Sequence, residues 1–161
     1  MDSPTPAQVF ERHHLQVYRF LRRMTSDSTL AEDLTQDVFV RVLGALDRYE
    51  PRGREASWVF RIARNVLNDQ RKSERRTPDL VEDGLPTLTS AGDPTLGFDL
   101  EQALSRVPVE EREALMLREY GGLGYEDISR ISGVSPAAVR SRIYRARRAM
   151  RGHLSPSGGT R

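Results

Sequence analysis

The sequence of 161 residues contains no cysteine, which excludes a disulfide framework and any metal site built on thiolates. No apolar run approaches the roughly 18 residues that a membrane-spanning helix needs, and the first residues lack the basic start and apolar core of a signal peptide. Only 37% of the residues are hydrophobic, which favours small helical units with thin cores over one large core. We expect a cytoplasmic protein without membrane insertion and without a cofactor.

Lysine is almost absent too, because Lys72 is the only lysine among 25 basic residues. Arginine suits bidentate contact with phosphate and guanine, although a GC-rich genome also favours arginine codons. The formal net charge is only +2, but the charge is unevenly placed: no Asp or Glu follows Asp127. Such a basic end of the chain indicates a polyanionic partner.

The spacing of apolar residues predicts helices throughout residues 6–76. Thr29 and Glu32 match a capping box at the start of a second helix, and a Pro-Arg-Gly stretch precedes a third helix over residues 57–73. The three predicted buried faces are Phe10, His14, Val17, Leu21 and Met24; Leu34, Val38, Val42 and Ala45; and Val59, Ile62, Ala63 and Val66.

Residues 77–97 are predicted to form a flexible acidic linker, because they contain three prolines, three glycines and four acids but no basic residue. Helical spacing resumes over residues 98–154. The sequence therefore predicts an all-α protein with two small helical domains, residues 6–76 and 98–154. The predicted core of the second domain begins with Leu100, Ala103, Leu104, Val107, Ala114, Leu115 and Leu117.

The segment YEDISRISGVSPAAVRSRIYRARRAM, residues 125–150, has the features of a helix-turn-helix. Gly133 stands where the turn needs a positive φ angle. Ser135 suits the N-cap of the second helix, and Pro136 suits its first turn. Any helical hairpin could use such a turn, so the turn alone does not establish DNA binding.

The second helix of this segment divides into two faces at about 100° per residue. The predicted buried stripe is Val139, Ile143, Ala146 and Met150, and the opposite side carries Ala137, Ser141, Tyr144, Arg145 and Arg148. The helix contains no acid to offset its arginines, which would repel one another without a polyanion. Its small N-terminal residues would let it enter a major groove, so the pattern favours DNA over a solvated helix.

Two parts of the chain resemble bacterial RNA polymerase sigma factors. AEDLTQDVFVRV, the W-x-x-R-I-A-R-N run from Trp58 and the basic end DQRKSERR resemble domain 2, and more narrowly that of the extracytoplasmic function (ECF) group. GLGYEDISRISGVSPAAVRSRIYRARRAM resembles sigma domain 4. The resemblance implies a non-enzymatic protein that binds the polymerase core, recognises the −35 and −10 promoter elements and promotes DNA melting.

The resemblance also implies a polymerase-binding surface. In the family, the helix that corresponds to residues 31–46 docks on a coiled coil of the largest catalytic subunit, and the flap region of the core is a further contact. The candidate residues are Asp33, Leu34, Gln36, Asp37, Phe39 and Arg41. Asp33 and Asp37 could instead be plain surface charges. Family membership implies an anti-sigma factor as a further partner.

Domain 2 of the family opens the −10 element and holds a flipped base. The candidate residues are Arg52, Arg54, Arg61, Arg64, Asn65, Asn68, Arg71, Lys72, Arg75 and Arg76. Asn65 and Asn68 could contact a base edge or cap the helix locally. Trp58, the only tryptophan, is better explained as a core residue than as a stacking platform.

Domain 4 of the family places the helix over residues 136–150 in the major groove of the −35 element. We expect Arg140, Ser141, Tyr144 and Arg145 near bases, and Arg142, Arg147 and Arg148 nearer phosphates.

Three other classes of protein fit less well. A one-component or response-regulator transcription factor needs a ligand or receiver domain, and nothing before Arg76 has that pattern. An enzyme is disfavoured because the adjacent His13 and His14 point to different faces of a helix and no phosphate loop occurs. A purely structural helical adaptor is disfavoured by the basic, acid-free helix.

Overall fold

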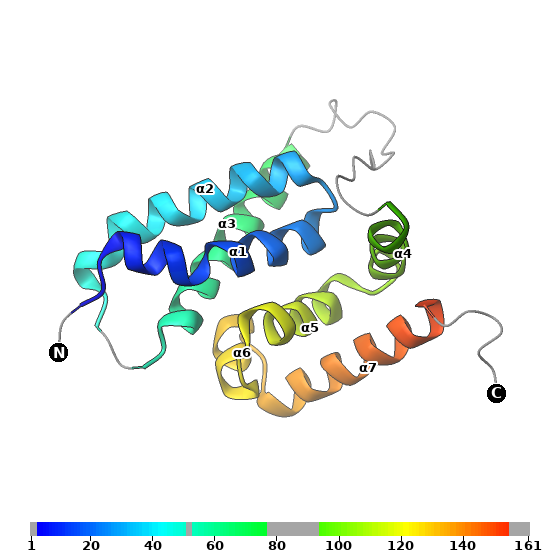
Figure 1. The fold of residues 1–161 in the computed structure, drawn as a ribbon. Coiled ribbons are helices and arrows are strands. Elements are labelled where there is room, and N and C mark those ends of the chain that lie inside the picture. The colour runs from blue at the N-terminus through cyan, green and yellow to red at the C-terminus, as the bar shows by residue number, and fades with distance from the viewer. Residues whose placement is uncertain (1–2, 51–52, 77–93, 155–161) are drawn as a thin grey trace.

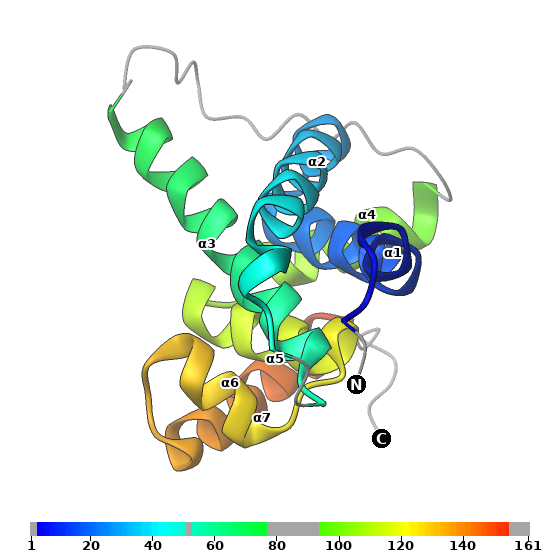
Figure 2. The same ribbon diagram turned by 90° about the vertical axis from the view of Figure 1, so that its left-hand side faces the viewer.

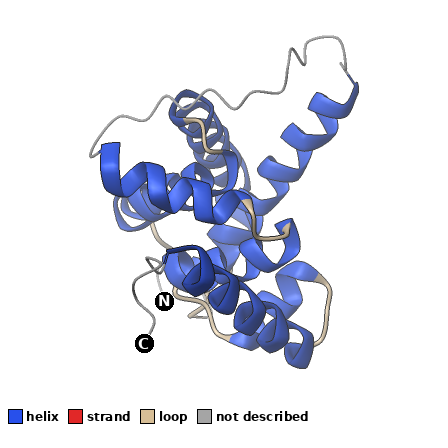
Figure 3. Cartoon of the chain, turned by 90° about the vertical axis from the view of Figure 1, so that its right-hand side faces the viewer, coloured by secondary structure: helices blue, strands red, loops and turns tan. Residues whose placement is uncertain are grey.

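The structure is a computed structural model that describes residues 3–50, 53–76 and 94–154, with side chains for all of these except 94–98 and 153–154. Within these ranges the chain consists of helices and loops, with no strand (Figure 3). The prediction of an all-α fold is therefore confirmed. None of the described helices is both long enough and apolar enough to cross a membrane.

The first helix, α1 (Pro6–Thr25), begins at a capping box that the sequence analysis missed. The hydroxyl of Thr5 accepts a hydrogen bond from the amide of Gln8 at 3.2 Å, and the amide of Thr5 donates to the Gln8 side chain at 2.9 Å. Pro6 occupies the first turn, where its missing N–H costs nothing.

The buried face of α1 differs from the prediction at its N-terminal end. Val17, Leu21 and Met24 are buried as predicted, but Phe10 is exposed and His14 is half-buried. The buried residues of the helix are Val9, Val17, Phe20, Leu21 and Met24. At this end of the helix the buried residue is Val9, one position before Phe10, and Phe10 remains on the surface.

The second helix, α2 (Ser28–Ala45), is capped by Asp27, whose carboxylate accepts a hydrogen bond from the amide of Leu30 at 3.0 Å. The capping box predicted at Thr29 and Glu32 is wrong, because the chain enters the helix two residues earlier and both residues lie inside it. The buried residues are Ala31, Leu34, Val38 and Val42. Leu34, Val38 and Val42 were predicted, Ala31 was not, and the predicted Ala45 is half-buried.

A short 3-10 helix, η1 (Leu46–Arg48), leads toward the long helix α3 (Glu55–Arg76). This helix extends beyond the predicted residues 57–73 at both ends. Its buried apolar residues are Val59, Phe60, Ala63, Val66 and Leu67, whereas the predicted Ile62 is half-buried. The Phe60 ring packs edge-on against Phe20 of α1 at 5.7 Å. The C-terminal end of α3 projects away from the other helices (Figure 2).

The C-terminal helix group contains α4 (Pro94–Ser105), α5 (Val109–Gly121), α6 (Tyr125–Ser132) and α7 (Pro136–Leu154). Most of the linker predicted for residues 77–97 lies outside the described residues, and its last four residues begin α4. Of the predicted core residues, Ala103, Leu104, Val107, Ala114, Leu115 and Leu117 are buried, and Leu100 is half-buried.

The C-terminal helix group (α4–α7) packs against the N-terminal helix group (α1–α3), as Figures 1 and 2 show. α5 lies along α1, and α3 contacts both α5 and α6. Arg22 of α1 forms an ion pair with Glu101 of α4, and Arg23 donates to the Tyr120 hydroxyl at 3.3 Å. The buried side chains of both groups form one hydrophobic core. The sequence did not predict this closure, because it rests on contacts between residues far apart in the chain.

Candidate nucleic-acid interface

The turn between α6 and α7 has the predicted helix-turn-helix geometry. Gly133 adopts φ +77°, a left-handed conformation that glycine reaches without steric cost. The Ser129 hydroxyl donates to the Val134 carbonyl and ties the turn to α6. The Ser135 hydroxyl accepts a hydrogen bond from the Ala138 amide at 3.1 Å, which is the predicted N-cap.

The buried stripe of α7 sets which side chains face outward. Val139, Ile143 and Ala146 are buried, as predicted, and Met150 packs against the core while half-exposed. The exposed candidates are Arg140, Ser141, Tyr144, Arg145, Arg147 and Arg148, and Arg142 is half-buried. Tyr144 is 58% exposed, so a large aromatic ring stands on the basic face with little packing of its own.

Two arginines of α7 have partners that the sequence argument overlooked. Arg145 lies 3.7 Å from the carboxylate of Glu111, and Arg147 lies 3.2 Å from that of Glu119. Both acids belong to α5, so the premise that nothing offsets these arginines is wrong. It counted acids within the helix only, whereas the fold brings acids from a neighbouring helix. Arg142 and Arg148 have no such partner among the described residues.

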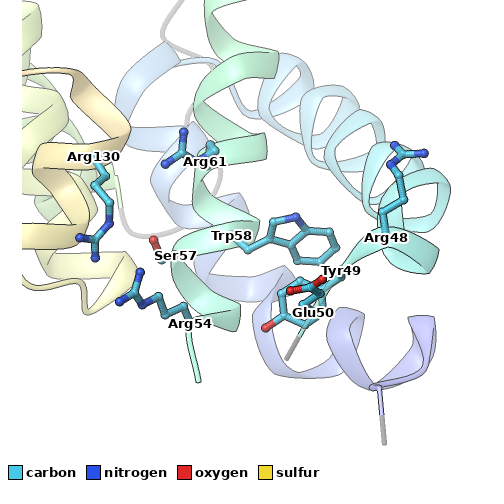
Figure 4. Close-up of a pocket in the computed structure, with 8 residues that line it drawn as sticks. All are labelled: Arg48, Tyr49, Glu50, Arg54, Ser57, Trp58, Arg61 and Arg130. Carbon is cyan, nitrogen blue, oxygen red and sulfur yellow. The ribbon is translucent and has the colours of Figure 1, made fainter. Parts of the chain in front are cut away.

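The second basic surface is a pocket where η1, the following loop and the start of α3 meet (Figure 4). The ring of Trp58 stacks on Tyr49 with centroids 4.3 Å apart and planes 29° apart. The cavity has a volume of about 350 Å³ and is lined by Arg48, Tyr49, Glu50, Arg54, Ser57, Trp58, Arg61 and Arg130. Arginine and aromatic side chains thus share one hollow, which suits a nucleotide.

The sequence analysis favoured a core position for Trp58, but the structure does not bury it completely. It packs against the core and is half-buried, but its ring also forms part of the pocket wall. Tyr49 was not among the candidate residues of the sequence analysis. A signal was present, since aromatic residues flank an arginine-bearing loop on both sides.

A half-buried carboxylate next to this pocket joins α3 to α1. Glu55, the first residue of α3, accepts hydrogen bonds from Arg12 at 2.8 Å and lies 2.8 Å from His13, both on α1. Burial alone would raise the pKa of Glu55, but the hydrogen bonds from Arg12 and His13 outweigh it and the pKa is lowered. Burial, with Glu55 nearby, raises the pKa of Tyr49.

Arg64 faces the C-terminal helix group rather than solvent. Its Nε lies 3.1 Å from the carboxylate of Glu113 on α5, and its Nη1 donates to the carbonyl of Ile131 on α6 at 3.0 Å. Glu113 is only 4% exposed. In this arrangement Arg64 therefore joins the two helix groups.

The remaining candidates on α3 spread toward its free end. Lys72, Arg75 and Arg76 are exposed, as is Asn65, and Asn68 is half-buried. Neither asparagine caps the helix through a hydrogen bond to a described residue. Burial lowers the pKa of Arg71, an effect that Glu113 partly offsets. Arg52 lies outside the described residues.

The predicted polymerase-binding residues lie on α2. Asp33, Gln36, Asp37 and Arg41 are exposed and Phe39 is half-buried. Leu34 is only 3% exposed, so it belongs to the core and cannot touch a partner directly. Arg41 forms an ion pair with Asp69 of α3 at 2.8 Å.

Helices α1 and α2 carry exposed apolar side chains that the sequence analysis missed. Phe10 and Leu15 on α1 are 46% and 49% exposed, and Val40 and Leu43 on α2 are 67% and 57% exposed. Between the two helices lies a hollow of about 460 Å³, lined by Phe10, His14, Leu15, Tyr18, Glu32, Thr35 and Gln36. Exposed apolar side chains in such a group are typical of a protein-binding surface.

Sequence comparisons match both halves of the chain to known families. The Sigma-70 region 2 family matches residues 9–77, and the Sigma-70 region 4 family matches residues 98–150. The ECF RNA polymerase sigma factor SigE of Mycolicibacterium smegmatis is 36% identical over 94% of this chain, which spans 62% of that relative. The RNA polymerase sigma factor CarQ of Myxococcus xanthus is 36% identical over 85% of this chain and 82% of its own length.

A solved structure has a similar arrangement of helices. The sigma factor RpoE of Bartonella quintana, crystallised with the anti-sigma factor NepR, superposes with a TM-score of 0.77 at 28% identity. The match covers 94% of this chain and 97% of that one. The likeness therefore extends over both helix groups and not over one of them alone.

Proposed function

Because the chain belongs to the ECF group of RNA polymerase sigma factors, we propose that it recruits the polymerase core to promoters through two DNA-binding surfaces. The observation that carries this proposal is the presence, in one chain, of an exposed basic helix-turn-helix and a separate basic aromatic pocket. The first suits duplex DNA, and the second suits a single strand.

The outer face of α7 enters the major groove of the −35 element. Ser141, Tyr144 and Arg148 stand at its centre, opposite the buried stripe. Arg145 and Arg147 reach DNA only by exchanging their ion pairs with Glu111 and Glu119. Both arginines are exposed, and the pair of Arg147 with Glu119 is exposed on both sides, so its exchange costs little.

The pocket beside Trp58 receives a base from the −10 element once the duplex opens. Extruding a base costs a few kcal/mol, and stacking on an aromatic ring returns about 1–3 kcal/mol per base. Arg54 and Arg61 line the same cavity and offset the charge of the strand. The exposed Lys72, Arg75 and Arg76 contact phosphates of the adjoining duplex.

The exposed part of α2 docks on the polymerase core. Asp33, Gln36 and Asp37 supply polar contacts there, and Val40 and Leu43 supply exposed apolar area beside them. Burying such area stabilises a complex by about 25 cal/mol per Å² before the costs of association. The C-terminal helix group contacts the flap region of the core. An anti-sigma factor is a further proposed partner, supported by the complex of the Bartonella quintana relative.

Run-off transcription with purified polymerase core on a promoter library tests this function. We expect transcripts only when the protein is added, from templates that share −35 and −10 sequences. Binding to core polymerase without DNA is measured in parallel, because a one-component transcription factor would bind DNA but not core. Promoter binding that is independent of core, with no transcripts, would overturn the proposal.

A further inference from the structure

The pocket beside Trp58 has one wall that belongs to the other helix group. Seven of its eight lining residues come from η1, the following loop and α3, and the eighth is Arg130 of α6. Arg64 holds α6 at this place, because its guanidinium donates to the carbonyl of Ile131, the residue after Arg130, at 3.0 Å. The hollow of about 350 Å³ is therefore complete only while the two helix groups are packed together.

The arginines and the aromatic rings of this pocket lie at different ends of it. The guanidinium groups of Arg54 and Arg130 lie on one side (Figure 4). The stacked rings of Tyr49 and Trp58 lie on the other side. Arg130 pairs with Asp127 at 2.7 Å, whereas Arg54 forms no ion pair with any residue that the structure describes. The cationic end therefore carries a positive charge that no described carboxylate offsets.

This division matches the two parts of a nucleotide. A base stacks on aromatic rings, and a phosphate accepts paired hydrogen bonds from guanidinium groups. Glu50, the one carboxylate among the lining residues, lies beside the rings and away from Arg54 and Arg130 (Figure 4). Pockets for small ligands enclose about 300–1,000 Å³, so a hollow at the lower end of this range has room for one nucleotide.

We propose that this pocket binds a free nucleoside 5′-phosphate while the two helix groups are packed together. The base packs against Tyr49 and Trp58, and the phosphate lies between Arg54 and Arg130. Because the ligand touches both helix groups, it stabilises their packed arrangement increasingly as its concentration exceeds its Kd. This site goes beyond the proposed function, in which the same rings take a −10 base, so a nucleotide and the −10 strand compete for them.

The test uses the fluorescence of the full chain without polymerase or DNA, because Trp58 is its only tryptophan. Adenosine 5′-monophosphate (AMP) should quench this fluorescence until the signal saturates. Adenosine lacks the phosphate and should bind about tenfold more weakly, as expected for the loss of charge-assisted hydrogen bonds. Inorganic phosphate should compete with AMP without quenching Trp58, because it has no base to stack on the ring.

Substitutions in the two helix groups test whether the site spans both. Arg54→Gln and Arg130→Gln should each weaken AMP binding about tenfold and leave adenosine binding unchanged, because each removes a charged donor to the phosphate alone. Arg106→Gln removes an exposed arginine elsewhere in the C-terminal helix group and should change neither affinity. Glu113→Ala lies outside the pocket but removes the carboxylate partner of Arg64, so it should weaken AMP binding by loosening α6.

The outcomes separate this site from the proposed function. Quenching that is absent or does not saturate overturns the nucleotide site. Equal AMP affinities for Arg130→Gln and Arg106→Gln overturn the contribution of α6, and adenosine that binds as tightly as AMP overturns the phosphate contact. None of these results decides the proposed function, which run-off transcription tests separately. A chain that binds AMP but yields no transcripts with the polymerase core overturns the proposed function and leaves this site standing.

Discussion

The arginines of the two helix groups find their counter-charges in different places. On α7, Arg145 and Arg147 pair with acids of α5 inside the same helix group, and both arginines are exposed. On α3, Arg64 pairs with Glu113, across the boundary between the groups and largely buried. The basic face of α7 is therefore exposed in the folded chain, whereas the guanidinium of Arg64 lies between the two helix groups.

How much each ion pair contributes to stability depends on its dielectric surroundings. An exposed ion pair contributes about 0–1 kcal/mol, because water screens it. A buried pair gains little net stability when formed, but removing one partner leaves a charge without compensation and costs several kcal/mol. Removing one partner of the pair between the groups should therefore destabilise the protein far more than removing one partner of a pair within one group.

Of the substitutions that test this difference, removing the carboxylate of Glu113 should have the largest effect on stability. We expect Glu113→Ala to lower the free energy of unfolding by about 2–3 kcal/mol, below the full range for buried pairs because the Arg64 side chain is 26% exposed. Glu119→Ala breaks an exposed pair and should cost no more than about 0.5 kcal/mol. Urea unfolding of the full chain measures both.

The same two variants test whether the pair holds the groups together. Small-angle scattering should give a larger radius of gyration for Glu113→Ala than for the wild type, and an unchanged one for Glu119→Ala. Equal losses of stability in the two variants, or equal radii, would mean that the contact between groups does not depend on Arg64.

Local features of the fold were predictable from the sequence. Gly133 and Ser135 determine the turn through backbone conformation and a hydrogen bond three residues away, so a short stretch of sequence contains all that is needed. Phe10 illustrates the limit, because its spacing to His14 and Val17 fits a buried stripe, but the packing of α1 against α2 and α5 leaves Phe10 exposed. The spacing of apolar residues predicts that one face of a helix is buried, but the packing of neighbouring helices decides which residues at the edge of that face are covered.

Much of the candidate site depended on contacts that no local pattern indicates. Arg64 pairs with Glu113, which lies 49 residues away in the chain, and Arg145 pairs with Glu111, which lies 34 residues away. The stacking of Tyr49 on Trp58 spans a loop. The sequence predicted which residues are basic and which helix presents them, and the fold decides which of them remain free.

Replacing one aromatic residue in each helix group sharpens the comparison between single-strand and duplex binding. Trp58→Ala should weaken holoenzyme binding to a single-stranded −10 oligonucleotide by about 1–2 kcal/mol, or roughly 5- to 30-fold, through lost stacking. Tyr144→Ala should weaken binding to a −35 duplex and leave the single strand unaffected, because Tyr144 lies on the exposed face of α7. Fluorescence anisotropy with both probes measures the effects.

Trp58→Phe serves as the control for packing, since it keeps an aromatic face in the pocket. It should restore most of the single-strand affinity. If Trp58→Ala weakens both probes equally, the residue supports the fold and not the base, and the distinction between the two surfaces fails.

Glu55→Gln should have a smaller effect than Glu113→Ala or Trp58→Ala, and it tests an ion cluster that lies within the N-terminal helix group. Its folded-state pKa is lowered because the hydrogen bonds from Arg12 and His13 outweigh its burial. A lowered pKa means that the cluster stabilises the protein at pH values above the ordinary carboxyl pKa, and that this contribution disappears as the pH falls through the folded-state value. Glu55→Gln should therefore be less stable than the wild type by about 1 kcal/mol at neutral pH, with the two unfolding curves converging below about pH 4. Because the cluster joins α1 to α3 and not one helix group to the other, the radius of gyration should stay unchanged, in contrast to Glu113→Ala. A stability difference that persists at low pH would show that Glu55 acts through packing and not through its charge.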